Sequence, residues 1–239
     1  LHRESVSYSQ LDEPVRWSKG DQLESTINEL LFLTEGEQES AFSGFDDGVH
    51  RVNLDQLINQ PGQLKAIYQL LHLAHYRTSP NDLRVLLDSP GQLLFVTIQS
   101  QELVGVAWIS EEGQLSAELT EAIAQGKRRP NGNLLPQTLI YSEGMVSLGA
   151  KRFWRVARIA VASECRRSGV AATMLDVIKA EAASSEVDFI GASFAGYQEV
   201  WQFWGACNFT AIRIGDRIDP VAGEPALLVL KALNAQAND

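Results

Sequence analysis

The chain has 239 residues, 45% of them hydrophobic, and it carries a formal net charge of −10. This length and apolar content suit a globular protein with a sizeable core, in one large domain or two small ones. The acidic balance argues against a free-standing nucleic-acid-binding protein, because phosphate contacts require clustered lysines and arginines. No apolar stretch is long enough to span a bilayer, and the N-terminal residues lack the apolar core of a signal peptide. We therefore expect a cytoplasmic protein that does not use a membrane.

The two cysteines of the chain are Cys165 and Cys207. They form no CxxC pair and have no histidine pair nearby, which are the spacings typical of redox motifs and zinc sites. The sequence therefore predicts two reduced thiols, with neither a disulfide framework nor a metal site.

The first 48 residues are expected to be an N-terminal extension or the edge of a preceding domain. Residues 1–20 are polar and show no clean period. Apolar residues at helical spacing within residues 23–31 predict a short helix, and the Gly-, Asp-, Glu- and Ser-rich residues 34–48 predict a loop. We expect the main domain and a short tail to cover residues 49–234 and 235–239.

The first half of the main domain is predicted to hold a strand, two helices and a hairpin. Apolar residues at the helical repeat indicate both helices, and the second begins where Ser79 caps a helix that has Pro80 at its first position. Two apolar runs joined by three polar residues indicate the hairpin. In chain order, these elements cover residues 49–54, 63–76, 80–87, 92–99 and 103–109.

A helical insert follows the hairpin. Two helices, over residues 115–124 and 134–141, flank the one basic, breaker-rich loop in this acidic chain, Gly126-Lys127-Arg128-Arg129-Pro130-Asn131-Gly132-Asn133. Beyond the insert, the pattern predicts a strand, a loop and a helix around residues 153–178. A strand, a helix and two closing strands then cover residues 187–195, 199–207, 209–214 and 226–233.

The stretch Arg158–Ala172, RIAVASECRRSGVAA, organises the domain, because it joins a strand to a helix through a short polar loop. Gly169 precedes the helix, and Arg166 and Arg167 precede the glycine. Free N–H groups at a helix start, the positive end of its dipole and two arginines all favour a bound anion. From spacing alone, a plain strand–loop–helix turn is the stronger interpretation and a phosphate cradle is the alternative.

The pattern Arg-x-x-Gly-x-Ala after a strand that ends Arg-Ile-Ala-Val resembles the acetyl-CoA loop of the GNAT acetyltransferases. That resemblance implies an α/β (α+β) fold of the GNAT acyl-CoA N-acyltransferase type. Its mixed, mostly antiparallel sheet would be flanked by helices, and here it would carry a helical insert and an N-terminal extension. The loop amides would hold the pyrophosphate of acetyl-CoA.

Further stretches resemble the acetyltransferase region of the bacterial tRNA(Met) cytidine acetyltransferases, and they lie at residues 73–84, 88–92, 126–134, 193–194 and 199–204. This resemblance implies acetyl transfer to the exocyclic N4 amine of cytidine at the wobble position of the elongator methionine tRNA. In that family a nucleotide-hydrolysing, helicase-like module precedes the acetyltransferase module. No Gly-x-x-x-x-Gly-Lys-Ser/Thr occurs here, so we expect no ATP site in this chain and interpret it as an isolated acetyltransferase module.

Carried over to this sequence, the resemblance implies three groups of coenzyme contacts. Strand backbone would meet the pantetheine arm, the loop would wrap the pyrophosphate, and one acidic residue would lie beside the coenzyme. These residues are, in turn, Ile159, Ala160 and Val161; Arg166, Arg167, Ser168, Gly169, Val170, Ala171 and Ala172; and Glu199.

Three places in this sequence depart from the family pattern. Ala206 stands where a basic coenzyme contact can occur, and Asn208 replaces the usual glycine before Phe209. Many GNAT enzymes place a tyrosine that protonates the leaving thiolate where this chain has Phe203-Trp204. Tyr197 is close in sequence, although not at the matching position.

His75 is the candidate general base, because the unperturbed pKa of histidine lies near the operating pH and the HYRTSPNDLR stretch borders the acceptor side in GNAT folds. The alternative is that His75 only packs or caps at the end of its helix. Lys127, Arg128 and Arg129 are the candidate RNA contacts, and a solvated loop is the alternative. Trp201 and Trp204, three residues apart, could stack on bases, but core packing is the more common use of that spacing.

Two other functions remain open at this point. One is acetylation of a protein or small-molecule amine, which must lose a proton before it attacks. The other is a non-catalytic acyl-CoA-binding module, favoured by the missing tyrosine and the missing nucleotide-binding module.

Overall fold

A computed structural model describes residues 18, 20–30, 41–74 and 80–234. The chain divides into two compact units, Leu1–Glu37 and Gln38–Asp239. In the first unit the described element is α1 (Gln22–Leu30), which confirms the predicted short helix. The carboxylate of Asp21 starts this helix, because it accepts hydrogen bonds from the amides of Leu23 and Glu24.

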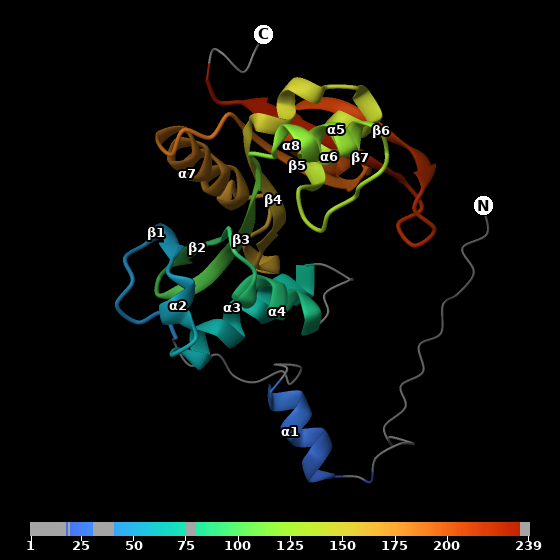
Figure 1. The fold of residues 1–239 in the computed structure, drawn as a ribbon. Helices are drawn as coiled ribbons and strands as arrows, with labels where there is room; N and C mark the ends of the chain where they lie inside the picture. The colour runs from blue at the N-terminus through green and yellow to red at the C-terminus, as the bar shows by residue number, and fades with distance from the viewer. Residues whose placement is uncertain (1–17, 19, 31–40, 75–79, 235–239) are drawn as a thin grey trace, which may run out of the picture. The chain divides into compact units, whose positions relative to one another are not determined.

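The second unit is built on a seven-stranded sheet (Figure 1). The strands follow the order β1-β2-β3-β4-β5-β7-β6, and every neighbouring pair is antiparallel except the parallel pair β4–β5. The mixed, mostly antiparallel sheet that the sequence predicted is therefore confirmed. Its strands are β1 (Gly48–Val52), β2 (Gln92–Gln99), β3 (Glu102–Gly113), β4 (Arg152–Val161), β5 (Phe189–Ala195), β6 (Thr210–Ile218) and β7 (Pro225–Ala232).

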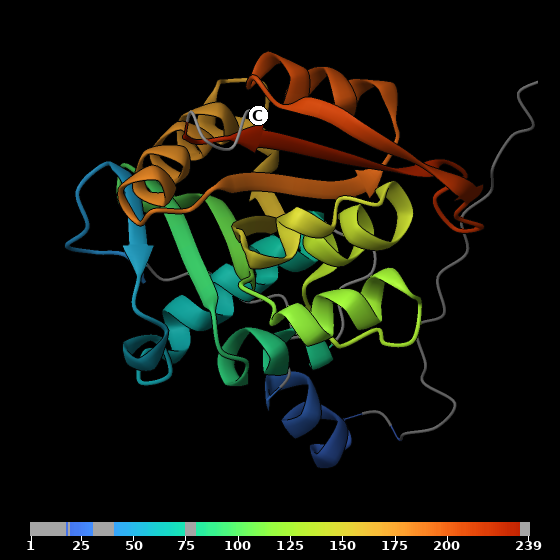
Figure 2. The same ribbon diagram turned by 45° about the horizontal axis from the view of Figure 1, so that its top comes forward.

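Helices cover both faces of this sheet. The described helical elements of the unit are α2 (Leu54–Leu57), α3 (Pro61–Ala74), α4 (Pro80–Asp88), α5 (Ala117–Ala124), α6 (Leu134–Glu143), η1 (Val146–Ala150), η2 (Ser163–Cys165), α7 (Val170–Ser184) and α8 (Gln198–Ala206). Figure 2 shows the C-terminal strands nearly edge-on, with α8 on one side and α6 on the other. Apart from the short elements α2, η1 and η2, this order of strands, helices and insert matches the predicted order.

Alternation along β4 shows how the sequence divides its side chains between the two faces. Trp154 and Val156 enter the core that α7 and α8 cover, through residues such as Met174. Phe153 points the other way, into a second cluster with Leu135 of α6. We call these two sides the α7 face and the α6 face.

Several predicted strands have different ends in the structure; the strand predicted to stop at residue 214, for example, continues as β6 to Ile218. Leu54 begins α2 instead of ending the first strand, because the side chain of Asn53 accepts hydrogen bonds from two following amides and starts a helix. The strand predicted to stop at residue 109 continues to Gly113. Its polar residues still pair with β4, and Glu111 accepts a hydrogen bond from the Trp154 ring. Polarity alone was therefore a poor signal for the strand end.

Within the described ranges, no helix combines the length and the apolar character that crossing a membrane requires.

Candidate coenzyme and acceptor site

The parallel pair β4–β5 opens partway along its length. The two strands pair only where Phe153, Trp154 and Arg155 face residues 189–191. Beyond that point β4 stays paired with β3 and β5 stays paired with β7, but no register joins β4 to β5. The facing backbone edges of residues 156–161 and 192–195 therefore border an opening into which an extended, amide-bearing molecule could pair.

A β-bulge in β4 lies where the opening begins. Ile109 of β3 pairs with Val156, whereas Trp108 pairs with Arg158, so Ala157 is the extra residue. Bulges bend a strand and increase its local twist, and they are common beside active sites. The sequence did carry this signal: the buried alternation through Trp154 and Val156 skips one position before it resumes at Ile159.

The loop after β4 ends in a helix start with free amides. The first hydrogen bond of α7 runs from the Thr173 amide to the Gly169 carbonyl, over 2.9 Å, so the N–H groups of Val170, Ala171 and Ala172 have no partner within the helix. No side chain caps this end. Amides without helical partners at the positive end of a 15-residue helix are suited to bind an anion.

Gly169 is required in this loop for its backbone angle. Its φ is +91°, which residues with a Cβ adopt only with strain, and a Cβ built there would meet no atom within 4 Å. The glycine is therefore explained by its backbone angle and not by crowding at its Cα. Arg167 also has a positive φ of +60°, and the guanidinium of Arg166 donates from Nε to the Val161 carbonyl at 3.2 Å.

The coenzyme residues expected from the sequence flank the opening. Ile159, Ala160 and Val161 are paired with β3 on one edge, which leaves the opposite edge facing the opening. Glu199 lies in the first turn of α8, directly after the end of β5. Asn208 adopts the left-handed conformation, with φ +64°, so it substitutes for a glycine in that turn.

The aromatic residues of α8 divide between core and surface. Trp204 is 3% exposed and stacks on Phe194, with ring centroids 5.7 Å apart, whereas Trp201 is 50% exposed. Core packing was the expectation for both tryptophans; it is confirmed for Trp204 and wrong for Trp201. Tyr197 is exposed, and its hydroxyl donates a hydrogen bond to the Ala222 carbonyl.

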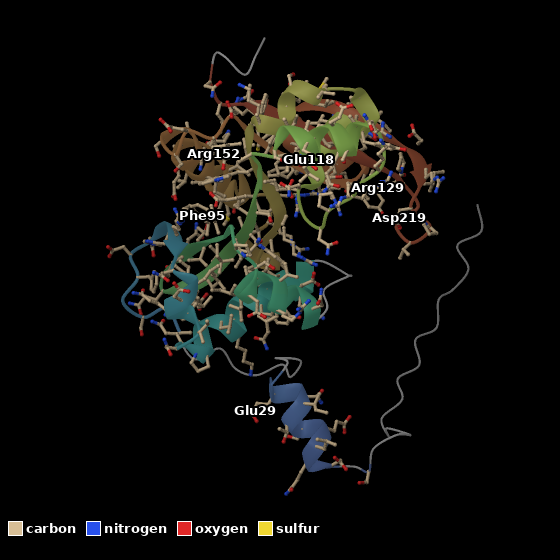
Figure 3. The ribbon with its side chains drawn as sticks, viewed as in Figure 1. Glu29, Phe95, Glu118, Arg129, Arg152 and Asp219 are labelled. Carbon is tan, nitrogen blue, oxygen red and sulfur yellow. The ribbon has the colours of Figure 1, made fainter. Side chains whose placement is uncertain are left out.

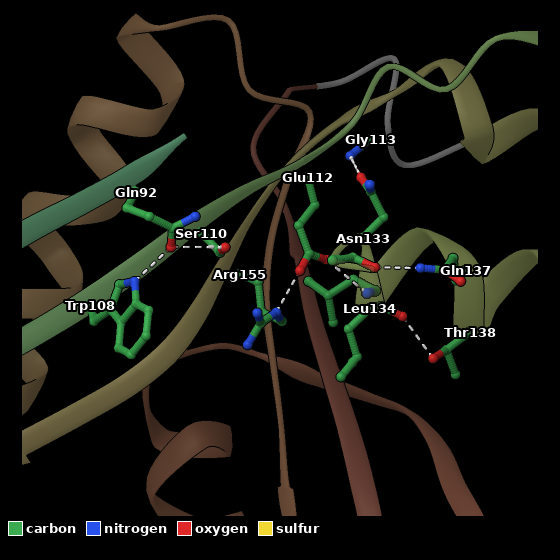
Figure 4. A network of polar contacts seen from close by, with 12 residues as sticks. Gln92, Trp108, Ser110, Glu112, Gly113, Asn133, Leu134, Gln137, Thr138 and Arg155 are labelled. Atoms are coloured by element: carbon green, nitrogen blue, oxygen red, sulfur yellow. Dashed lines mark hydrogen bonds and ion pairs between the residues drawn. The ribbon is translucent and has the colours of Figure 1, made fainter. Parts of the chain in front are cut away.

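On the α6 face, a polar cluster lies on β2, β3 and β4 beside the opening. Gln92 accepts hydrogen bonds from the Trp108 ring nitrogen at 2.7 Å and from the Ser110 hydroxyl at 3.2 Å (Figure 4). The guanidinium of Arg158 lies 5.9 Å from the Trp108 ring centroid and forms an ion pair with Asp82 of α4 at 3.1 Å. Sequence reasoning did not select this cluster, because its members are far apart in the chain.

Tyr68 of α3 belongs to the same region. Burial raises the pKa of its phenol, the negative charge of Asp82 raises it further, and Arg158 opposes the shift. His75, the predicted base, lies outside the described residues, between the end of α3 and the start of α4.

A second polar tie joins the insert to the sheet. Glu112 of β3 is 7% exposed, and its carboxylate accepts from Arg155 Nε at 2.6 Å and from the Leu135 amide at 2.8 Å (Figure 4). Asn133, before α6, accepts from the Gly113 amide at 2.7 Å. One buried carboxylate therefore satisfies the start of α6 and fixes an arginine on β4 at once.

The basic loop is exposed between α5 and α6. Figure 3 labels Arg129 among the side chains of this insert, and its guanidinium carbon lies 4.8 Å from the centroid of the Tyr141 ring. Arg128, Arg129 and Arg155 line one cavity of about 460 Å³, which Lys127 does not line. The structure thus brings two of the three predicted RNA contacts together with an arginine that sequence reasoning missed.

A mixed sheet that opens between its parallel strands, beside a helix start whose first amides have no helical partner, is the architecture of an acyl-CoA-dependent N-acetyltransferase. A family model described as "GNAT acetyltransferase 2" matches residues 66–181. The chain is a GNAT acetyltransferase module.

More particularly, the chain is related to the bacterial tRNA(Met) cytidine acetyltransferases TmcA. It is 36% identical to TmcA of Photorhabdus asymbiotica over 95% of this chain and 33% of that protein. It is 33% identical to TmcA of Vibrio cholerae over 97% of this chain and 32% of that protein. The chain therefore spans about a third of the length of these relatives.

Solved structures share the fold at low identity. A polyamine N-acetyltransferase of Drosophila melanogaster superposes with a TM-score of 0.55 at 11% identity, covering 78% of this chain and all of that chain. An aminoglycoside 6'-N-acetyltransferase complexed with coenzyme A gives a TM-score of 0.52 at 10% identity, covering 78% of this chain and 97% of that chain. These likenesses confirm the predicted fold class.

Proposed function

We propose that the chain transfers the acetyl group of acetyl-CoA to the exocyclic N4 amine of a tRNA cytidine, at the wobble position of the elongator methionine tRNA. The observation that carries this proposal is the relationship to TmcA across 95% of the chain. The opening between β4 and β5, with free amides at its end, supports it independently.

The coenzyme side of the site fits acetyl-CoA. The free edge of Ile159, Ala160 and Val161 can pair with the amide groups of the pantetheine arm. The N–H groups at the start of α7, together with Arg166, can hold the pyrophosphate. We assign the whole segment 166–172 to the diphosphate and place Glu199 beside the coenzyme.

The acceptor chemistry needs little prior activation. The cytidine amine is neutral at pH 7, so its nitrogen can attack the thioester carbonyl carbon directly, and a base is needed only to take the proton during or after attack. As the tetrahedral intermediate collapses, the carbon–sulfur bond breaks and coenzyme A leaves as a thiolate. His75 is the proposed base.

The rest of the assembly is also part of the proposal. Because the TmcA relatives are about three times as long as the matched segment, we propose that a helicase-like module helps to present the tRNA. Lys127, Arg128 and Arg129 are proposed to contact the RNA backbone. A tRNA acceptor places the reaction in the cytoplasm.

The direct test is to incubate the chain with acetyl-CoA and bulk tRNA, digest the RNA to nucleosides and measure N4-acetylcytidine by mass spectrometry. A parallel reaction receives the helicase-like module of a TmcA relative. Formation of N4-acetylcytidine in either reaction supports the proposal. Acetylation of amines but not of tRNA would mean that the acceptor is an amine and not a tRNA cytidine. Tight acetyl-CoA binding without any turnover would identify a non-catalytic binding module.

A further inference from the structure

We propose that the cavity between the basic loop and α6 binds a backbone phosphate of the RNA acceptor, and that Arg155 contacts that phosphate. This inference rests on the proposed function, since it takes the acceptor to be an RNA. The cavity of about 460 Å³ lies within the range of about 300–1,000 Å³ that small-molecule sites occupy. It can therefore hold one nucleotide unit of a longer chain.

The charge of the cavity is opposite to that of the whole protein. Three arginines line it and no aspartate or glutamate is among its lining residues, although the chain has 30 acidic and 20 basic residues. The other polar groups of the wall are neutral: Asn131, Gln137, Thr138, Tyr141 and Ser142. Such a wall attracts a phosphate and repels a protonated amine, which distinguishes an RNA acceptor from a lysine or polyamine.

Two of the three arginines are held in place before any ligand arrives. The Tyr141 ring supports the guanidinium of Arg129, and buried Glu112 accepts from Nε of Arg155. Among the described residues, Nε is the side-chain atom through which Arg155 makes its ion pair, so its two terminal nitrogens remain available as a fork for phosphate oxygens. Glu112 is thus a positioning residue, and less side-chain entropy is lost on binding.

The place of Arg155 on β4 links the cavity to the reaction. Arg155 is the last residue of β4 that pairs with β5, so the opening begins at the next residue. Its side chain lies on the α6 face, whereas α7 and α8 cover the opposite face. An acceptor that enters from the α6 face would pass the cavity as it reaches the opening, and a phosphate bound there would fix its register.

The test measures RNA binding without turnover. A fluorescently labelled anticodon stem-loop of the elongator methionine tRNA is titrated with wild-type chain and with Arg155→Gln at several NaCl concentrations. We expect the affinity of the variant to fall about tenfold, and the slope of log K against log [NaCl] to flatten by about 0.7 because one phosphate is no longer neutralised. The dissociation constant of acetyl-CoA should not change.

Arg51→Gln is the matched control, because Arg51 is an exposed arginine in a 2.6 Å ion pair with Glu181, on the edge strand β1. It removes the same charge and should leave the slope unchanged. If Arg155→Gln alone does not fold, the titration is repeated with the double variant Glu112→Gln, Arg155→Gln. This double variant has no unpaired buried carboxylate.

A folded Arg155 variant with wild-type affinity and slope overturns the inference. An equally flattened slope in Arg51→Gln overturns it as well, because the effect would then be general charge. A third outcome separates the two proposals. If the wild-type chain binds the stem-loop but forms no N4-acetylcytidine, and only Arg155→Gln flattens the slope, the cavity is supported while the proposed reaction fails.

Discussion

Arg158 of β4 and Asp82 of α4 form an ion pair of 3.1 Å that ties the helix after residues 75–79 to the strand at the opening. Their side chains are 14% and 25% exposed, so the pair is largely removed from water. The segment that contains the proposed base therefore precedes a helix that is anchored to β4 at the opening.

Asp82→Asn should weaken this anchor. This change removes the negative charge from a largely buried pair, so we expect the free energy of unfolding to fall by about 1–3 kcal/mol. The kcat for acetylation should fall while the dissociation constant of acetyl-CoA stays constant. Asp176→Asn is the control, because Asp176 is 73% exposed in its pair with Lys179 and should change stability by less than about 0.5 kcal/mol. Equal effects of the two variants would contradict this role of Asp82.

Gly169→Ala tests the loop over the α7 amides. A φ of +91° is unfavourable for alanine, so the free energy of unfolding should fall by about 1–2 kcal/mol. Acetyl-CoA should also bind more weakly in calorimetry, since relief of the strain moves the amides. Gly205→Ala is the control: Gly205 lies in α8 with no atom within 4 Å of a built Cβ, and alanine there should stabilise the chain by about 0.5–1 kcal/mol. Unchanged coenzyme affinity in Gly169→Ala would argue against a diphosphate at this loop.

His75→Ala tests the proposed base. Loss of a positioned base typically lowers the rate by about 10²–10⁴-fold, so acetylation should fall by that factor while the affinity for acetyl-CoA is unchanged. His72→Ala is the control, because His72 is an exposed histidine in the last turn of α3. Full activity in His75→Ala would remove the residue from the mechanism.

Replacing Lys127, Arg128 and Arg129 together by glutamine tests the loop as a whole. The salt dependence of tRNA binding should flatten by about 0.7 for each phosphate that the loop no longer neutralises. Because Arg128 and Arg129 line the cavity and Lys127 does not, the Lys127→Gln single variant should account for the smallest share. An unchanged slope in the triple variant would leave the loop as a solvated connection.

Asp188 makes stability depend on pH at the acid end. Burial raises the pKa of its carboxyl, but hydrogen bonds from the Arg152 amide and Asn234, with the charge of Lys151, outweigh this and lower it below its usual range. The carboxylate therefore stabilises the fold fully above the unfolded-state pKa of about 4 and loses that contribution as the pH falls through the lowered folded-state pKa. In urea unfolding, the stability lost in Asp188→Asn should be constant near neutral pH and shrink below about pH 4. A difference that does not vary with pH would contradict this.

Much of the fold could be predicted because local patterns agreed with tertiary structure. The helical repeat predicted α3 and α7, and the apolar run predicted β5. The four-residue α2 was missed, because it depends on the Asn53 cap rather than on any repeat. The end of β3 was missed because Glu112 is buried by pairing with Arg155, a partner 43 positions away.

The candidate site shows the same division. The strand, loop and helix around Gly169 could be predicted, since the residues that form them are consecutive in the sequence. The contacts of Arg155 and Arg158 could not be predicted, because an arginine in a strand does not reveal its ion-pair partner. Their partners, Glu112 and Asp82, come from other elements, which a single sequence does not place.

The bulge at Ala157 changes the side-chain alternation of β4 for residues 158–161. With it, Ile159 and Val161 return to the α7 core although three positions separate Val156 from Ile159. If Ala157 instead took a regular place in the ladder, strict two-residue alternation from Val156 would turn Ile159 and Val161 to the opposite face of the sheet. The bulge at this one alanine, which has no reactive side chain, thus determines the face of the sheet on which each later side chain of β4 lies.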